Sequence, residues 1–102
     1  MEKKTNTEKT KENGNCVYVG KKHIYRYVLA CHKNLSEKGD TKIVARGRNI
    51  SKAVDTAEIV KRNYANLSEE ISIGSEQVND EEKKKTLNIS TIAINLSLSQ
   101  NG

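Results

Sequence analysis

The sequence predicts an α/β domain whose elements follow one another in the order β-α-β-α-β-β. Three observations lead to this prediction. Two short apolar runs each end at a glycine turn, each turn leads into a segment with the apolar spacing of a helix, and the last third changes to the two-residue alternation of strands. The 102 residues suffice for one small domain, and with four Tyr, no Phe and no Trp its core must be aliphatic.

The first half of the chain begins with a polar segment. Residues 1–15 have no apolar residue after Met1 and are predicted to form a disordered tail. Residues 16–19 are a short apolar run that Gly20 ends, which indicates a buried strand. A helix follows and should stop at Gly39. Its apolar face is predicted to contain Ile24, Tyr27, Val28, Cys31 and Leu35.

A second strand and helix come next. Residues 42–45 are the strand, the turn is Arg46-Gly47-Arg48, and Asn49 is the predicted N-cap of the second helix. This helix should end between Asn63 and Asn66. Its predicted apolar face contains Ile50, Ala53, Val54, Ala57, Val60 and Tyr64.

The last third predicts a hairpin with a charged tip. Ile71 and Ile73 alternate with polar residues, residues 79–85 interrupt the apolar pattern, and residues 87–98 resume it as a long strand. Residues 99–102 should fray, so the predicted folded domain is 16–98.

The charge is uneven along the chain. Basic and acidic residues number four and three in residues 1–16 (+1), eleven and four in 17–66 (+7), and three and six in 67–102 (−3). Because strands joined by a helix normally lie parallel, Gly20-Lys21-Lys22 should lie beside Arg46-Gly47-Arg48 at one edge of the sheet. A basic patch of this kind attracts a polyanion, either nucleic acid or an acidic membrane surface, although solvated basic turns are the simpler alternative.

Other chemistry has little support in the sequence. Gly14 lies one residue too far from Gly20 for a nucleotide-binding loop, and Lys22 stands where a hydroxyl should be. The two cysteines are predicted to be reduced, and with the two histidines they lack the spacing of a zinc site. The carboxylates of Asp55 and Glu58 are more simply partners of nearby lysines on a helix surface. We therefore predict no cofactor, no metal and no enzyme, and keep an enzyme acting on nucleic acid as an alternative.

A membrane protein is also not predicted. No segment approaches the roughly 20 apolar residues of a membrane span, and the first residues lack an apolar signal core. The sequence thus predicts a soluble protein made in the cytosol.

Three stretches together resemble the Alba family of small chromatin and RNA-binding proteins. They are Gly20-Lys21-Lys22, Tyr27-Val28-Leu29-Ala30 and residues 45–60, and the resemblance covers about residues 16–98. It implies a two-layer α/β sandwich with an extended hairpin of the last two strands. It also implies a homodimer, or a heterodimer with another Alba-type chain, that binds double-stranded DNA and RNA without sequence preference.

The resemblance also suggests roles for individual residues. Lys21 and Lys22 match the central DNA-contacting lysines of the family, and the hairpin arms, about residues 78–87, would embrace the minor groove. In the family, acetylation of the lysine that matches Lys21 weakens DNA binding, and a Sir2-type deacetylase reverses it. The complete predicted contact set is Lys21, Lys22, Arg26, Arg46, Arg48, Asn49, Lys52, Lys83, Lys84 and Lys85.

The polar tail and the asparagine-rich composition look more like those of a eukaryotic-type member. For such a member, RNA binding and a location in both nucleus and cytoplasm are expected. Two alternatives stay open, a scaffold subunit of one ribonucleoprotein such as ribonuclease P and an RNA-binding translational regulator. Whether DNA or RNA is the main ligand also stays open.

Overall fold

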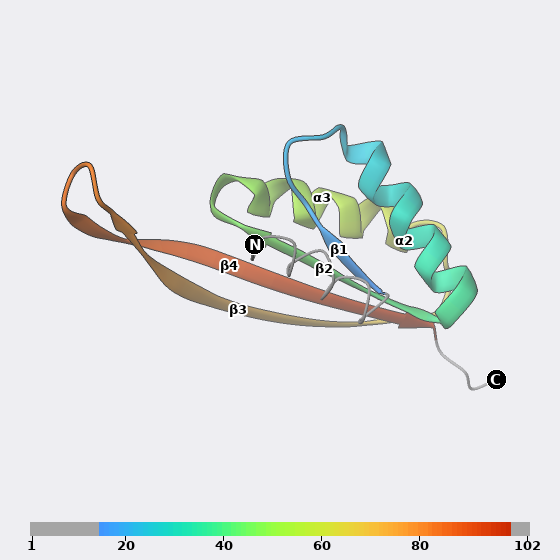
Figure 1. Ribbon diagram of the computed structural model, residues 1–102. Coiled ribbons are helices and arrows are strands. Elements are labelled where there is room, and N and C mark those ends of the chain that lie inside the picture. Colours follow the sequence, from blue (N-terminus) through green and yellow to red (C-terminus); the bar gives the residue numbers. More distant parts are fainter. Residues whose placement is uncertain (1–14, 99–102) are drawn as a thin grey trace.

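The computed structural model describes residues 15–98, which form a four-stranded mixed sheet with two helices on one face (Figure 1). The strands follow the spatial order β1-β2-β4-β3; β1 is parallel to β2, and the other neighbours are antiparallel. The predicted α/β class and order of elements are confirmed. The elements are β1 (Cys16–Tyr18), α2 (Ile24–Lys38), β2 (Asp40–Arg46), the 3-10 turn η1 (Gly47–Asn49), α3 (Ile50–Lys61), β3 (Leu67–Asp80) and β4 (Lys85–Leu98).

The core lies between the sheet and the helices. In β2 the side chains of Thr41, Ile43 and Ala45 are buried while their neighbours are less so, which is the alternation expected of a sheet covered on one face. On β4 their cross-strand partners are Leu96, Ile94 and Ile92, all buried as well. Among residues 15–98, both helices lie on this face of the sheet and bury it (Figure 1).

Helix α2 follows its predicted pattern. Tyr27, Val28, Cys31 and Leu35 are buried, and Gly39 ends the helix in a left-handed conformation with φ of 83°. The N–H of Gly39 donates to the carbonyl oxygen of Leu35 at 3.0 Å, so the glycine caps the last turn.

Helix α3 differs from its prediction in two respects. It ends at Lys61, before the predicted end at residues 63–66, and Val54 is 40% exposed although it was assigned to the apolar face. Thr56 is buried instead, because its hydroxyl donates to the carbonyl oxygen of Lys52 at 2.7 Å and so satisfies its polar group within the helix. Within residues 15–98, neither helix is long and apolar enough to cross a bilayer.

Strands β3 and β4 form an arm that projects beyond the helices (Figure 1). Each has 14 residues, and they pair from Leu67 opposite Leu98 to Asp80 opposite Lys85. The radius of gyration is 15.0 Å, above the roughly 13 Å of a compact 100-residue domain, because of this arm. The predicted tip of residues 79–85 was too long, since the strands continue to Asp80 and Lys85 and only residues 81–84 connect them.

The base of the arm is tied to α3. The ammonium group of Lys61 bonds to Glu69 on β3 at 2.9 Å and to Glu58 on its own helix at 3.1 Å. Hydrogen bonds to Glu69 and then Glu58 raise the pKa of Lys61. Apart from Asn15, the predicted tail lies outside the described residues, as does the predicted frayed segment 99–102.

Candidate nucleic-acid interface

Two basic turns leave the sheet at the same end, where strands β1 and β2 finish. Tyr18 of β1 lies opposite Val44 of β2 in parallel register, and the N–H of Val19 donates to the carbonyl oxygen of Val44 at 2.9 Å. The first basic turn, residues 20–22, and the second basic turn, residues 46–48, therefore follow neighbouring strand ends. The structure brings the two turns together as the parallel arrangement predicts.

Lys52 joins the first basic turn to α3. Its ammonium group donates to the carbonyl oxygens of Gly20 and Lys22 at 2.9 and 2.8 Å, and it lies 5.9 Å from the centre of the Tyr27 ring. Because Lys52 lies in the first turn of α3, the helix that follows the second basic turn also holds the first. The contact predicted between Lys52 and nucleic acid stays a prediction. In the structure its ammonium group has partners inside the protein.

Tyr27 fixes the same turn from the other direction. Its hydroxyl oxygen accepts the N–H groups of Gly20 and Lys22 at 3.0 and 2.9 Å. Those two backbone donors are used internally, so an anion at this turn would be bound by the exposed side chains of Lys21 and Lys22. Sequence reasoning assigned Tyr27 only to the core. The signal for its second role is that a buried tyrosine needs a polar partner for its hydroxyl.

The second basic turn has an unexpected helix entry. Gly47 has φ of 59°, and the N–H of Ile50 donates to the carbonyl oxygen of Gly47, so a 3-10 turn runs directly into α3. Asn49 is consequently helical, with φ of −86° and ψ of −3°, and its side chain makes no capping hydrogen bond. Asn49 does occupy the predicted N-cap position directly before α3. Its side chain does not cap the helix, because a capping side chain needs extended backbone at that residue.

The two arginines of this turn differ in their surroundings. Arg48 is exposed. Arg46 is exposed too, but its guanidinium group lies 3.3 Å from the carboxylate of Glu76 on β3. Both partners are about half exposed, so the ion pair is weak and an incoming phosphate could replace the carboxylate.

The remaining predicted contacts lie in two places. Arg26 is exposed in the first turn of α2, next to the first basic turn. Lys83, Lys84 and Lys85 are exposed at the tip of the arm, apart from the two turns (Figure 1). The arm nevertheless extends past the end of β2, because Arg46 pairs with Thr91 and β4 begins six residues earlier, at Lys85. The tip and the turns are thus at the same end of the sheet.

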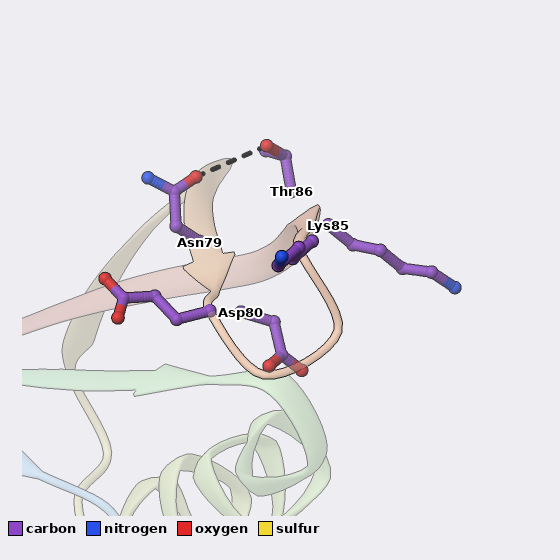
Figure 2. Close-up of a pocket in the computed structure, with 6 residues that line it drawn as sticks. Asn79, Asp80, Lys85 and Thr86 are labelled. Carbon is purple, nitrogen blue, oxygen red and sulfur yellow. Dashed lines mark hydrogen bonds between the residues drawn. The ribbon is translucent and has the colours of Figure 1, made fainter.

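The tip is a tight turn organised by an acid. The carboxylate of Asp80 accepts the N–H groups of Glu82 and Lys83 at 3.1 and 3.2 Å. Just behind it, the hydroxyl of Thr86 donates to the side-chain oxygen of Asn79 at 3.3 Å, joining the two strands (Figure 2). The three acids, Asp80, Glu81 and Glu82, balance the formal charge of the three lysines.

The thiols and carboxylates offer no second kind of site in the described chain. Across residues 15–98 no three His, Cys, Asp or Glu side chains are placed to hold a metal ion. Both cysteines are free thiols. Burial raises the pKa of Cys31 to about 11, against a smaller lowering by its hydrogen bond with Thr41, so this thiol is a neutral core group.

Sequence comparison places this chain among known proteins. The Alba family model matches residues 15–80. The DNA/RNA-binding protein Alba of Methanocella arvoryzae is 40% identical over 83 residues, which cover 78% of this chain and 85% of that protein. The DNA/RNA-binding protein Alba 2 of Methanopyrus kandleri is 52% identical over 50 residues, 48% of this chain and 54% of that protein, so the match spans about half of that relative. Both relatives are archaeal, and the expectation of a eukaryotic-type member stays a prediction.

Solved structures give the same result for the fold. Alba from Thermoplasma volcanium superimposes with a TM-score of 0.71 at 37% identity, covering 81% of this chain and 99% of that one. ALBA1 from Trypanosoma brucei gives a TM-score of 0.62 at 18% identity, with coverage of 84% and 70%, and supports the fold alone. With the family model matching most of the described residues, this chain belongs to the Alba family.

Proposed function

We propose that this protein binds double-stranded DNA and RNA through their phosphate backbones, without reading base sequence, and that it acts as a binding protein and not as an enzyme. The observation that carries the proposal is the pair of basic turns held at one end of the sheet, after β1 and β2. Internal hydrogen bonds fix the backbone of the first turn, while Lys21, Lys22 and Arg48 extend into solvent. The relatives named DNA/RNA-binding protein Alba support the same function.

Phosphate binding suits this arrangement better than base recognition. Base reading needs side chains held in a fixed geometry against base edges, whereas long lysine side chains on a rigid turn supply mobile charge. The arm lies at the same end of the sheet. Its lysines could contact phosphates of a long polymer that lie beyond the two turns.

We also propose a dimer, homodimeric or with another Alba-type chain, formed through an apolar surface next to α3. Ile71 and Ile73 point to the helix-covered side of the sheet, because they pair with the buried Ile94 and Ile92. They lie on the edge strand and are 53% and 79% exposed. A two-fold axis at this edge would cover the same apolar patch on both copies at once. The dimer would double the number of basic turns on one polymer.

Regulation at Lys21 follows from the same mechanism. Lys21 is exposed, and we propose it as the substrate of an acetyltransferase and of a Sir2-type deacetylase. Acetylation would remove one charge from the first basic turn and weaken phosphate binding. For the cellular location we keep nucleus and cytoplasm, since both DNA and RNA are proposed ligands.

Salt-dependent binding tests the function. If a dimer neutralises about six to eight phosphates, log K should fall with log[salt] at a slope of roughly −5 to −7. The double change Lys21→Ala and Lys22→Ala should weaken binding similarly for unrelated duplex sequences and reduce the slope by roughly 3 to 4, since it removes two phosphate-binding lysines from each copy in the dimer.

The matched control is Lys33→Ala with Lys38→Ala, because both lysines are exposed on α2 beyond its first turn and the charge change is the same. This control should change the slope little. A slope near zero for the unchanged protein would remove the electrostatic mechanism, and equal effects of the two double variants would reduce it to net charge. Cleavage of DNA or RNA by the purified protein would contradict the non-enzymatic part of the proposal.

A further inference from the structure

Two stacked aromatic rings lie beside the first basic turn. His23 follows Lys22 directly, and the ring of Tyr25 lies 5.2 Å from its imidazole ring between centroids, with the planes 14° from parallel. Tyr25 is 60% exposed and lies outside the buried face of α2. The phosphate contacts proposed above do not use either ring.

The backbone holds this pair in place. His23 is the N-cap of α2, and its Nδ1 accepts the N–H of Tyr25 at 3.3 Å. The turn that precedes it is fixed by Tyr27 and Lys52. A ring held by such a fixed backbone loses little conformational freedom when another flat group stacks on it. This lowers the entropic cost of binding.

We propose that the His23–Tyr25 pair is a stacking platform for an unpaired base of a single-stranded nucleic acid, RNA or DNA. The inference rests on the proposed function and adds a second kind of ligand contact to the same end of the sheet. Exposed aromatic rings next to cationic side chains are the combination that single-strand binders use, because the ring takes the face of a base and the cations take the neighbouring phosphates. Here the flanking cations are Lys21, Lys22 and Arg26.

A duplex cannot use this platform in the same way. Inside a double helix both faces of each base are covered by its neighbours, so Tyr25 could reach a base face only by unstacking the duplex. Single-stranded loops and ends of RNA leave base faces open. The first basic turn should therefore hold duplexes by charge alone and single strands by charge and stacking together.

Binding measurements with the full chain test the platform. The probe is a single-stranded oligouridylate of about 12 nucleotides, and a duplex of equal length is the second arm. Tyr25→Ala should weaken binding of the single strand by about 5- to 100-fold and leave the duplex within about 2-fold. Tyr25→Phe, which keeps the ring, should bind the single strand like the unchanged protein. Leu29→Ala is the matched control, because Leu29 is 67% exposed one helical turn further along α2.

Fluorescence gives a direct readout of stacking. The chain has no tryptophan, so Tyr25→Trp creates a single reporter at the platform. Oligouridylate should quench its emission strongly, while the duplex should not. Leu29→Trp should respond little to either ligand. This readout stays informative even if Tyr25→Ala lowers the stability of α2.

The possible failures can be distinguished. If Lys21→Ala with Lys22→Ala weakens both ligands and Tyr25→Ala weakens neither, the platform is wrong and the proposed function stands. If neither variant has an effect, both are wrong. Equal losses on single strand and duplex for Tyr25→Ala would also overturn the platform. A similar loss on oligodeoxythymidylate is expected from stacking alone, because DNA and RNA bases both offer an open face; a loss confined to one of the two polymers would overturn base stacking as the mechanism.

Discussion

The ammonium group of Lys52 lies between the carbonyl oxygens of Gly20 and Lys22, at 2.9 and 2.8 Å. This geometry makes Lys52 a positioning residue for the first basic turn, distinct from the exposed lysines that would touch phosphate. The distinction has a measurable consequence. A lysine that binds phosphate releases a counterion from the nucleic acid, whereas one that holds the protein backbone does not.

We predict that Lys52→Met lowers the free energy of unfolding by about 1.5 to 3 kcal/mol, because the ammonium group makes two charge-assisted hydrogen bonds. It should also weaken nucleic-acid binding through loss of order in the turn, without changing the slope of log K against log[salt]. Lys21→Met, as the comparison, should reduce that slope by about 1 for each phosphate that is no longer neutralised. Urea unfolding measures the change in stability, and salt titrations of binding measure the slope. Equal slope changes in the two variants would show that Lys52 contacts phosphate directly.

Cys31 makes stability depend on pH. Burial raises the pKa of its thiol in the folded protein to about 11 from an ordinary value of 9.0. The neutral thiol is therefore favoured by folding, so its contribution is fully present below pH 9.0 and is lost as the pH rises toward about 11. We predict that the free energy of unfolding falls by about 2 to 3 kcal/mol across this window. Urea unfolding at several pH values measures it.

The control for this prediction is Cys31→Ala. It should lower stability below pH 9.0, since it leaves a cavity in the core, and its disadvantage should shrink as the pH rises toward about 11. Lysines and tyrosines titrate in the same range, and the variant retains them. Its pH dependence should accordingly be shallower than that of the unchanged protein; equal slopes would assign the effect to the other groups.

At the scale of elements, a carboxylate on the long arm competes with an incoming phosphate for Arg46. Glu76 of β3 crosses the open face of the sheet to pair with Arg46 at 3.3 Å. We predict that Glu76→Gln tightens nucleic-acid binding by about 2- to 5-fold at low salt, because Arg46 is released and a repulsive charge is removed. The unfolding free energy should change by less than about 1 kcal/mol, as expected for an exposed pair.

Glu70→Gln provides the matched control for that change. It lies on the same strand and, six residues away, on the same face of the sheet, and the net charge changes equally. If both variants tighten binding to the same extent, the effect comes from net charge and the Arg46–Glu76 pair has no special part in it. Competition binding with a labelled duplex is sensitive enough for differences of this size.

The elements were predictable where their signals are local. The apolar spacing of α2, the stop at Gly39 and the apolar run of β2 each depend on a few neighbouring residues, and the parallel pairing of β1 and β2 follows from the helix between them. The hydrogen bonds of Lys52 and Tyr27 were missed. They join side chains to backbone atoms, in one case 32 residues away, which no periodicity reports. Asn49 precedes α3 as predicted but makes no capping hydrogen bond, because the residue type permits such a bond and cannot exclude a 3-10 entry.

For the whole molecule, the unequal sides of the sheet suggest how two copies assemble. Helices α2 and α3 cover β1, β2 and β4, while the edge strand β3 presents Ile71 and Ile73 on the helix side without full cover. A small domain with an aliphatic core gains stability by covering such a patch. Assembly at this edge would also leave the basic turns free, because they follow β1 and β2 at the other side of the sheet.

We predict that Ile73→Glu produces a folded monomer. Ile73 is 79% exposed, so the substitution should change the stability of the single chain by no more than about 0.5 kcal/mol, whereas in a dimer it would bury a charge opposite its own copy. Leu29→Glu, an equally apolar-to-charged change on exposed α2, should stay dimeric. Sedimentation or light scattering reports the mass, and the salt titration reports the function. Because a monomer carries half the basic turns, its slope of log K against log[salt] should fall to roughly −3, and a dimeric Ile73→Glu protein with an unchanged slope would move the interface elsewhere.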